Sequence, residues 1–375
     1  MRERLTFAAL WALVLFYLAA SPIAAARDAD FTHLWVAGAA WFEGGAYDPV
    51  LQKELLWAAL EEPLWAARND ALGSFFYPPT ALLMYVPLGW LPVHRAALVM
   101  AVLNTILGVG AGLLISALSP RGEAAGVALV LLFPSFFFAY VLGQNGALTL
   151  VLLLGALLAS KRGRPWLAGL LLGLTAWKPS WFFAVCWLWV LMPGRFKVLG
   201  GMVVGAVGLV LASLPLGGWP EFLELAPRIA ALSEQGDYPA HLQFNLQGLS
   251  LRYGAAWPGW LAAAAVVGVT LWKGQGRLPA ALVAATLANP HMHHYDALPA
   301  LLAVAVLGRW WVVVLFHAAF VLSEGLGLSA WVPLPTLAML GVWALSLSGV
   351  LEPRPDSSGP TALQPSSPRA PGLAD

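Results

Sequence analysis

The sequence AALVMAVLNTILGVGAGLLISAL, residues 96–118, runs for 23 residues without a charged side chain. A helix of about 20 predominantly apolar residues is long enough to cross the hydrocarbon core of a membrane. Comparable apolar segments recur along the chain, so we predict an all-α fold, a polytopic transmembrane helical bundle of about 12 spans. The predicted spans are residues 5–24, 96–118, 124–141, 145–160, 165–177, 179–192, 198–216, 254–272, 278–290, 295–308, 309–325 and 331–350.

The composition agrees with a surface that faces lipid. Of the 375 residues, 60% are hydrophobic and only 10% are charged, whereas an ordinary soluble domain carries about 25% charged residues. A charge at the bilayer centre costs about 2.5–3.5 kcal/mol on insertion scales, so a membrane protein avoids it. The net charge of +1 argues against a nucleic-acid partner, which would need a basic patch. The single cysteine, Cys186, is interpreted as a packing residue.

The chain divides into one large domain and a tail. Residues 1–351 form the predicted transmembrane domain, and residues 27–95 are its first outer loop, with short surface or re-entrant helices. Residues 352–375 are rich in Pro and Ser and predict a disordered cytoplasmic tail.

The N-terminus has two interpretations. Arg2 and Arg4 precede an apolar run that ends in small residues, which resembles a cleavable signal peptide. The alternative is a first membrane helix that stays attached, and we favour it because the rest of the chain is itself membrane-spanning. In both cases the residues after Ala26 lie outside.

Lys and Arg in the short loops set the orientation, because cytoplasmic loops carry an excess of both residues. With the N-terminus inside and alternating spans, the basic loops all fall on the inner side, and both termini lie inside. We therefore expect a multi-pass protein of the plasma (inner) membrane. The basic residues placed inside are Arg121, Lys161, Arg162, Arg164, Arg195, Lys197, Lys273, Arg277, Arg309 and Arg354.

Two segments are too short to be ordinary spans. Residues 80–92 contain Pro87, and counting them as a span would invert every later loop, so we interpret them as a re-entrant or surface helix on the outer side. The short helices on either side of Lys178 are predicted to form a hairpin whose tip opens below the outer surface.

This topology gathers the unusual polar residues on the outer side, where an ionisable group near a span is by default a functional hypothesis. Asp30 could act as a general base toward an acceptor hydroxyl, or it could be a solvated loop acid or a helix N-cap. Asp28 is the weaker candidate. Lys178 could bind an anion such as a lipid phosphate, or it could be a lysine that extends to the interface.

The histidine cluster of the late outer loop has three interpretations. His291, His293 and His294 with Asp296 offer four potential metal ligands, but their spacing fits no defined zinc signature. We expect no metal and no cofactor. Hydrogen bonding or proton transfer by His291 or His294 in an outer pocket is favoured over capping of the next helix.

Two amides begin a helix on the outer side. Gln144 and Asn145 could hydrogen-bond sugar hydroxyls, or Asn145 could simply be an N-cap. Tyr77, Tyr295, Asp296 and Asp28 complete the predicted substrate-binding residues. The glycine pairs lack the spacing of a phosphate-binding loop, so no nucleotide site is indicated and an activated sugar would arrive on a lipid.

In their order along the chain, these segments resemble the bacterial family of polyprenyl-phosphate-mannose-dependent α-1,2-mannosyltransferases, within the C-type glycosyltransferase superfamily. The resemblance covers roughly residues 1–350 and rests on the ordered set rather than on one motif. The shared segments are Asp30-Phe31, Ala37-Gly38, GGAYDP at 44–49, YPP at 77–79, Pro87-Leu88, GQN at 143–145, AGLLLG at 168–173, Lys178-Pro179, Pro290-His291 and Tyr295-Asp296.

The resemblance implies C-type glycosyltransferase architecture with an essential aspartate in the first outer loop, which corresponds to Asp30. It implies a polyprenyl-phosphate sugar donor, a basic residue near the donor phosphate, here Lys178, and a histidine from the late loop. The run of residues 291–294 departs from the family pattern, and we rank His291 and His294 above His293.

We therefore expect an enzyme that moves a hexose, with mannose expected, from the lipid-linked donor to a lipid or glycan acceptor on the extracytoplasmic face by a single inverting displacement. A transporter or flippase of lipid-linked sugars is the alternative, but it would need polar residues along a path through the membrane. A non-enzymatic membrane scaffold and an enzyme resembling protein O-mannosyltransferases or polymer-assembling enzymes are further alternatives.

Overall fold

The computed structural model describes residues 30–60, 75–118, 123–234, 245–255, 257–273, 278–289 and 334–348, with the isolated residues 12, 15, 16, 318 and 319. All regular elements within these residues are helices, which confirms the all-α prediction for this part of the chain. The elements are α2 (Asp30–Phe42), α3 (Pro49–Ala59), α4 (Pro79–Gly89), α5 (Val93–Leu118), α6 (Glu123–Leu131), α7 (Pro134–Val141), α8 (Gly146–Lys161), α9 (Pro165–Leu174), η1 (Thr175–Trp177), α10 (Pro179–Val185), η2 (Cys186–Leu191), α11 (Arg195–Ser213), η3 (Leu214–Leu216), α12 (Trp219–Glu234), α13 (Leu246–Leu251), α14 (Trp257–Lys273), α15 (Leu278–Ala288) and α18 (Leu334–Leu347).

Two of the described helices have the length and hydropathy of a membrane span. They are α5, with 26 residues, and α11 together with η3, with 22 residues. At a rise of about 1.5 Å per residue, each exceeds or matches the hydrocarbon thickness of about 30 Å. The other apolar helices in the described ranges are shorter, so the full count of about 12 spans remains a prediction.

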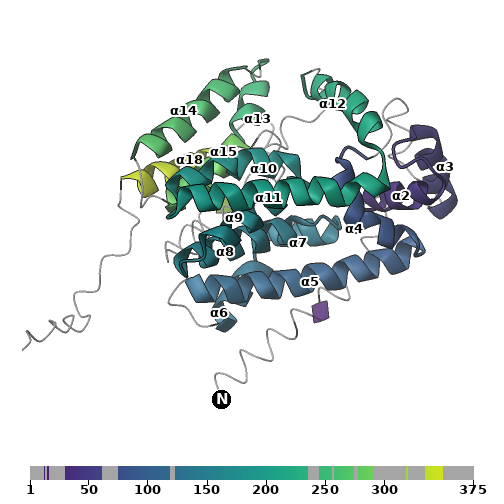
Figure 1. Ribbon diagram of the computed structural model, residues 1–375, viewed down its shortest axis with the longest axis horizontal. Coiled ribbons are helices and arrows are strands. Elements are labelled where there is room, and N and C mark those ends of the chain that lie inside the picture. The colour runs from purple at the N-terminus through teal and green to yellow at the C-terminus, as the bar shows by residue number, and fades with distance from the viewer. Residues whose placement is uncertain are drawn as a thin grey trace, which may run out of the picture.

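The long helices expose apolar side chains rather than polar ones. Leu98, Ile106 and Leu113 are exposed on α5, and Val204 and Leu211 are exposed on α11. A helix that is apolar on both its packed and its exposed faces is typical of a membrane span. Figure 1 shows α5 and α11 extending along the long axis of the molecule.

The segment 124–141 is not one helix, which corrects the predicted single span. α6 ends at Leu131, Phe133 is extended with φ −76° and ψ 129°, and α7 begins at Pro134. Proline disfavours the helical conformation in the residue before it and is suited to the first helical position, so the sequence breaks the span here.

The segment 217–253 also contains two helices that we did not predict, α12 and α13. Gly217 and Gly218 precede α12 with φ of 69° and 81°, a conformation that L side chains rarely adopt. The indole of Trp219 then donates to the Ser213 hydroxyl at 3.2 Å, which ties the start of α12 to the end of α11.

The Lys178 hairpin has the short arms that we predicted. The first arm, Pro165–Trp177, changes from α-helix to 3₁₀ geometry at Thr175, and the second arm is Pro179–Leu191. Lys178 between them is extended, with φ −123° and ψ 95°, because Pro179 excludes the helical conformation at the preceding residue.

Glycines bring the first arm of this hairpin against α11. A Cβ added at Gly169 would stand 1.9 Å from the Val198 oxygen, and one added at Gly173 would stand 2.2 Å from the Met202 oxygen. Gly201 and Gly205 make the reciprocal approach from α11. Four-residue glycine spacing on both partners allows backbones to approach closely, as in membrane helix pairs. Because Gly169 meets Val198 and Gly173, one turn later, meets Met202, α9 and α11 run parallel.

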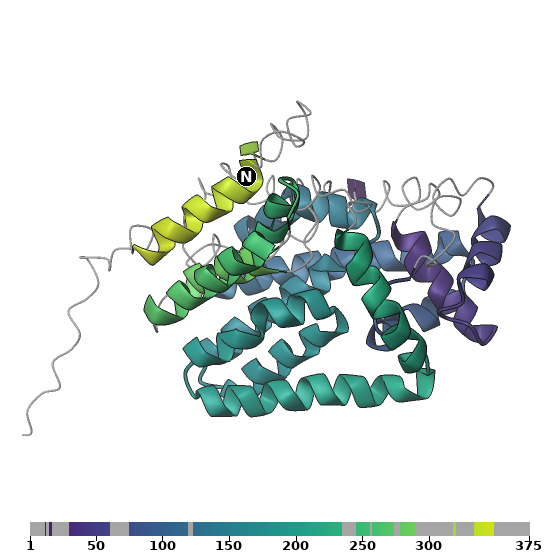
Figure 2. The same ribbon diagram turned by 90° about the horizontal axis from the view of Figure 1, so that it is seen from above.

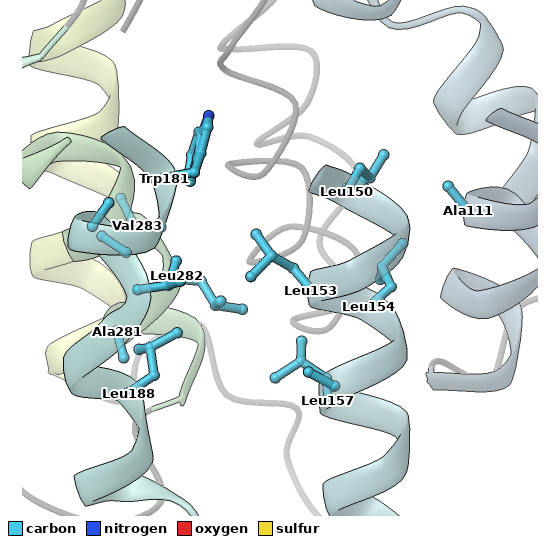
Figure 3. Close-up of a cluster of buried hydrophobic side chains, with 14 of the residues drawn as sticks. Ala111, Leu150, Leu153, Leu154, Leu157, Trp181, Leu188, Ala281, Leu282 and Val283 are labelled. Carbon is cyan, nitrogen blue, oxygen red and sulfur yellow. The ribbon is translucent and has the colours of Figure 1, made fainter. Parts of the chain in front are cut away.

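The largest apolar core lies between α8 on one side and α10, η2 and α15 on the other. Figure 3 shows Leu153 and Leu157 of α8 pointing toward Leu282 of α15 and Leu188 of η2, and all four side chains are buried. Farther out, the Trp343 indole of α18 donates to the Thr270 hydroxyl of α14 at 2.9 Å. Figure 2 shows these two helices side by side, with α11 along the opposite face.

A second core joins the N-terminal helices. α2 and α4 cross so closely that a Cβ added at Gly89 would stand 2.2 Å from the Gly38 carbonyl carbon. The Trp35 indole donates to the Leu91 carbonyl at 3.0 Å, and the Trp41 indole donates to the Leu216 carbonyl at 2.7 Å. These bonds fix α2, α3 and α4 at the end of the bundle where α5 begins and α11 ends (Figure 1).

The opposite end of the bundle carries basic residues. The Lys161 ammonium donates to the Leu118 carbonyl at 3.3 Å, and a Cβ added at Gly194 would stand 3.1 Å from Pro165 Cβ. The ends of α5 and α8 therefore meet the starts of α9 and α11. Lys161, Arg162 and Arg164 at the turn from α8 to α9, and Arg195 and Lys197 in the first turn of α11, lie at this end.

Replacing Gly205 with Ala should destabilise the folded protein by about 1–3 kcal/mol, because the new Cβ would overlap packed backbone. That Cβ would stand 2.5 Å from the Leu170 oxygen, whereas one at Gly208 on the same helix meets nothing within 4 Å. The matched variant Gly208→Ala should be neutral or stabilising by up to about 1 kcal/mol, since Ala favours helix over Gly. Thermal unfolding in detergent compares the two variants, and equal melting temperatures would contradict this packing.

Candidate active site

Asp30 lies in the first turn of α2, where the helix dipole favours a negative charge. The backbone N–H of the next residue, Phe31, donates to the Leu142 carbonyl at 2.9 Å. This bond satisfies one of the N–H groups that a helix start leaves without an internal partner. It also places the turn between α7 and α8 directly against the carboxylate.

Gly143 makes that contact possible. Its φ is +64°, in the left-handed region, and a Cβ added there would stand 2.3 Å from Phe31 Cβ. Only glycine combines the turn with so close an approach. The tripeptide GQN at 143–145 is therefore built around the start of α2.

Gln144 joins Asp30 to Tyr77. Its Nε2 donates to Asp30 Oδ2 at 2.8 Å, and the Tyr77 hydroxyl lies 3.4 Å from its Oε1. The Gln144 residue is only 3% exposed. A hydrogen bond to a carboxylate is stronger than one between neutral groups, so Gln144 fixes the carboxylate firmly.

Tyr77 continues the contacts to Lys178. Its ring lies parallel to that of Trp177, with an interplanar angle of 8° and a centroid distance of 6.4 Å. The Lys178 ammonium lies 5.9 Å from the Tyr77 ring centroid, within the range of a cation–π interaction. Lys178 is 3% exposed, and a buried ammonium needs compensating partners of this kind.

Tyr47 holds Tyr77 from the other side. Its hydroxyl donates to the Tyr77 carbonyl at 2.7 Å. Burial raises the pKa of Tyr47 above its ordinary value, and the nearby Glu221 carboxylate raises this pKa further. The hydroxyl therefore keeps its proton and remains a donor. Phe222 of α12 packs on the same ring at 6.3 Å, which connects α12 to the site.

Asn145 lies at the N-cap position of α8 but makes no capping bond. Its Nδ2 donates to the Tyr85 hydroxyl at 2.7 Å and lies 3.4 Å from Met84 Sδ. Asn145 thus connects the start of α8 to α4, and the capping interpretation is wrong for its side chain.

The structure brings together Asp30, Tyr77, Gln144 and Lys178, with Asn145 adjoining. These five come from four separate stretches of the chain and lie at the end of the bundle opposite the basic turns. The other predicted site residues lie outside the described residues, as do the span 295–308, the tail 352–375 and, apart from residues 12, 15, 16, 318 and 319, the spans 5–24 and 309–325. Those site residues are Asp28, His291, His294, Tyr295 and Asp296.

Sequence reasoning missed Asn104, Tyr85 and Tyr47. Asn104 is a buried amide near the middle of α5, and its Nδ2 donates to the Gln144 carbonyl at 2.9 Å. A polar side chain inside a long apolar run is a signal that could have identified it. Among the described residues, no three His, Cys, Asp or Glu side chains form a group that could hold a metal.

The described part of the chain is entirely helical, with span-length apolar helices and a polar cluster at one end, and is compatible with the class of membrane-embedded enzymes. The family model of glycosyltransferase family 87 matches residues 75–312, more than half of the chain. The chain therefore belongs to glycosyltransferase family 87. No curated protein and no solved structure matches it.

The family match confirms the predicted glycosyltransferase activity, whereas the α-1,2-mannosyltransferase subtype stays a prediction. The matched residues include Tyr77, Gln144 and Lys178, and Asp30 precedes them.

Replacing Gly143 with Ala should destabilise the protein more than the same change at Gly163. Both glycines have positive φ, so both variants incur the left-handed strain of about 1–2 kcal/mol. The Gly143 variant adds a clash with Phe31, while a Cβ at Gly163 meets nothing within 4 Å. Thermal unfolding of the two purified variants measures the difference, and equal losses would show that Phe31 does not confine this turn.

Proposed function

We propose that this glycosyltransferase moves a hexose, with mannose the expected sugar, from a polyprenyl-phosphate donor to a lipid or glycan acceptor at the extracytoplasmic face of the plasma membrane. The reaction is a single inverting displacement. Asp30 is the general base, and Lys178 binds the donor phosphate.

The observation that carries the proposal is the continuous contact from Asp30 through Gln144 and Tyr77 to Lys178. A carboxylate for the acceptor proton and a cation for the leaving phosphate are the two groups that this displacement requires. Lys178 is buried and Asp30 is half-buried, and preorganised charges act more strongly in such surroundings than in water.

The acceptor oxygen attacks the anomeric carbon and forms the new glycosidic bond, while its proton passes to Asp30. The bond from the anomeric carbon to the phosphate oxygen breaks, and the polyprenyl phosphate leaves with its charge beside the Lys178 ammonium. His291 or His294 would assist this charge. The phosphate monoester is a fair leaving group, so no metal is invoked.

A lipid-linked donor suits the position of Lys178. The Trp177 indole N–H is buried and has no acceptor among the residues that the structure describes. A phosphate beside Lys178 would supply an acceptor for such a donor. The prenyl chain of the donor would remain in the bilayer that the apolar faces of α5 and α11 contact.

The basic turns support the proposed extracytoplasmic position of the site. Lys161, Arg162, Arg164, Arg195 and Lys197 gather at the end of the bundle away from Asp30 and Lys178. Since basic short loops favour the cytoplasm, the site would face the extracytoplasmic side. Tyr77, Asn145, Tyr295, Asp296 and Asp28 remain proposed contributors to substrate binding.

Replacing Asp30 with Asn should abolish sugar transfer, with turnover falling by about 10²–10⁴-fold, because Asn cannot accept the proton. Donor binding and the melting temperature should change little. Asp48→Asn is the matched control, since Asp48 is an exposed N-cap of α3 and Asn caps equally well. The assay uses purified protein with polyprenyl-phosphate mannose, glucose or arabinose and native lipid extracts. Near-normal turnover by the Asp30 variant would refute the assignment.

Replacing Lys178 with Gln should weaken donor binding and slow transfer, each by about tenfold or more, because a charge-assisted contact to the phosphate is lost. Lys161→Gln at the opposite end should leave both unchanged. Donor affinity is measured by displacement of a fluorescent polyprenyl-phosphate probe. Movement of the donor across vesicle membranes without any transfer would support the transporter alternative instead.

A further inference from the structure

We propose that Gln144 is a positioning residue that orients the Asp30 carboxylate, and that Asn104 secures Gln144 from within α5. This inference rests on the proposed role of Asp30 as the general base. It replaces the prediction that Gln144 binds a sugar hydroxyl.

Gln144 contacts protein through all four of its polar groups. Its backbone N–H donates to the Ala139 carbonyl at 2.7 Å, and its carbonyl accepts from Asn104 Nδ2 at 2.9 Å. Its side-chain Nε2 donates to Asp30 Oδ2, and its Oε1 faces the Tyr77 hydroxyl. An amide held in this way orients a neighbour better than it adapts to a substrate.

The two ends of the Gln144 amide are not interchangeable at this position. An ionised carboxylate accepts hydrogen bonds only, so the amide nitrogen must face Asp30. Its oxygen then faces the Tyr77 hydroxyl, which donates. The neighbours therefore select one orientation of Gln144, and that orientation leaves Asp30 Oδ1 as the oxygen that Gln144 does not engage.

Neither exposure to lipid nor apolar packing explains an amide side chain at Asn104. It is 1% exposed, and its Oδ1 has no hydrogen-bond partner among the described residues. A buried amide with an unpaired oxygen is unfavourable, so packing alone does not explain it. Within the described residues, the Asn104 side chain donates its hydrogen bond to the backbone carbonyl of Gln144.

Kinetics of Gln144→Leu separate positioning from sugar binding. A misplaced base lowers kcat, and small misplacements cost up to about 10²-fold, so we expect at least about a tenfold loss. The KM values for donor and acceptor should stay within about twofold, because ground-state binding is untouched. A raised KM with unchanged kcat would instead restore the sugar-binding role and overturn the proposal.

The pH dependence of kcat/KM is a second test of the positioning role of Gln144. A hydrogen bond donated to a carboxylate favours its charged form, so Gln144→Leu should move the acid limb of kcat/KM to higher pH. The described titratable groups near Asp30 are Tyr77 and Tyr85, with Lys178 beyond the Tyr77 ring and His33 on the next turn of α2. An unmoved acid limb would contradict the proposal.

Asn104→Leu tests the second part. We expect kcat to fall by about threefold to tenfold with KM unchanged, since the Gln144 backbone loses one anchor. Thr105→Val is the matched control, because Thr105 is the next residue of α5, is also buried, and donates to the Ala101 carbonyl of its own helix at 2.9 Å. Equal kinetics for the two variants would remove Asn104 from the proposal.

A double-mutant cycle of melting temperatures tests the Asp30–Gln144 contact without an activity assay. Gln144→Leu should lower the melting temperature of the wild-type protein more than that of the Asp30→Ala variant, because the contact exists only in the former. Additive shifts would overturn the proposal. If wild-type protein transferred no sugar from any donor, the proposed function would fail, while the cycle would still decide whether this contact exists.

Discussion

The site depends on the contact between the first turn of α2 and the turn that precedes α8. The Phe31 N–H reaches the Leu142 carbonyl, and Gly143 lies so close to Phe31 that no side chain fits between them. With the two backbones fixed, the distance from the Gln144 amide to the Asp30 carboxylate is fixed as well. A loop that carried Asp30 without this anchor could not hold a base in one orientation.

The apolar bundle sets the rest of the arrangement. Charged and amide groups are costly within it, so they gather where the helices end or pair with one another. The helices on either side of Lys178 are short, so the lysine lies within the bundle rather than beyond its end. The glycine contacts between α9 and α11 hold the first of these helices in place. The turns that carry Lys161, Arg162 and Arg164 lie at the other end of the bundle, whereas Lys53 of α3 and Arg95 of α5 lie at the same end as the site.

The sequence predicted the helical class, the hairpin at Lys178 and the grouping of Asp30 with Lys178, because charges are scarce in an apolar chain and their positions relative to spans are informative. It did not predict the break before Pro134, although the proline was visible, because hydropathy alone treats 124–141 as continuous. The sequence also did not predict the hydrogen-bond partners of Gln144 and Asn145. Choosing among nearby acceptors requires the packing of α2 and α4 against α8, which no local pattern encodes. Asn104 was overlooked because one amide does not change the average of a long apolar run.

The parallel course of α9 and α11 bears on the order in which the protein assembles. Their glycine contacts join residues within one continuous stretch, so this unit can form as soon as that stretch has entered the membrane, since local contacts cost little chain entropy. The Asp30–Gln144 bond joins residues 114 apart and must wait for α8. During synthesis, Asp30 therefore stays without its Gln144 partner, and this end of the molecule is completed only after the intervening helices are in place.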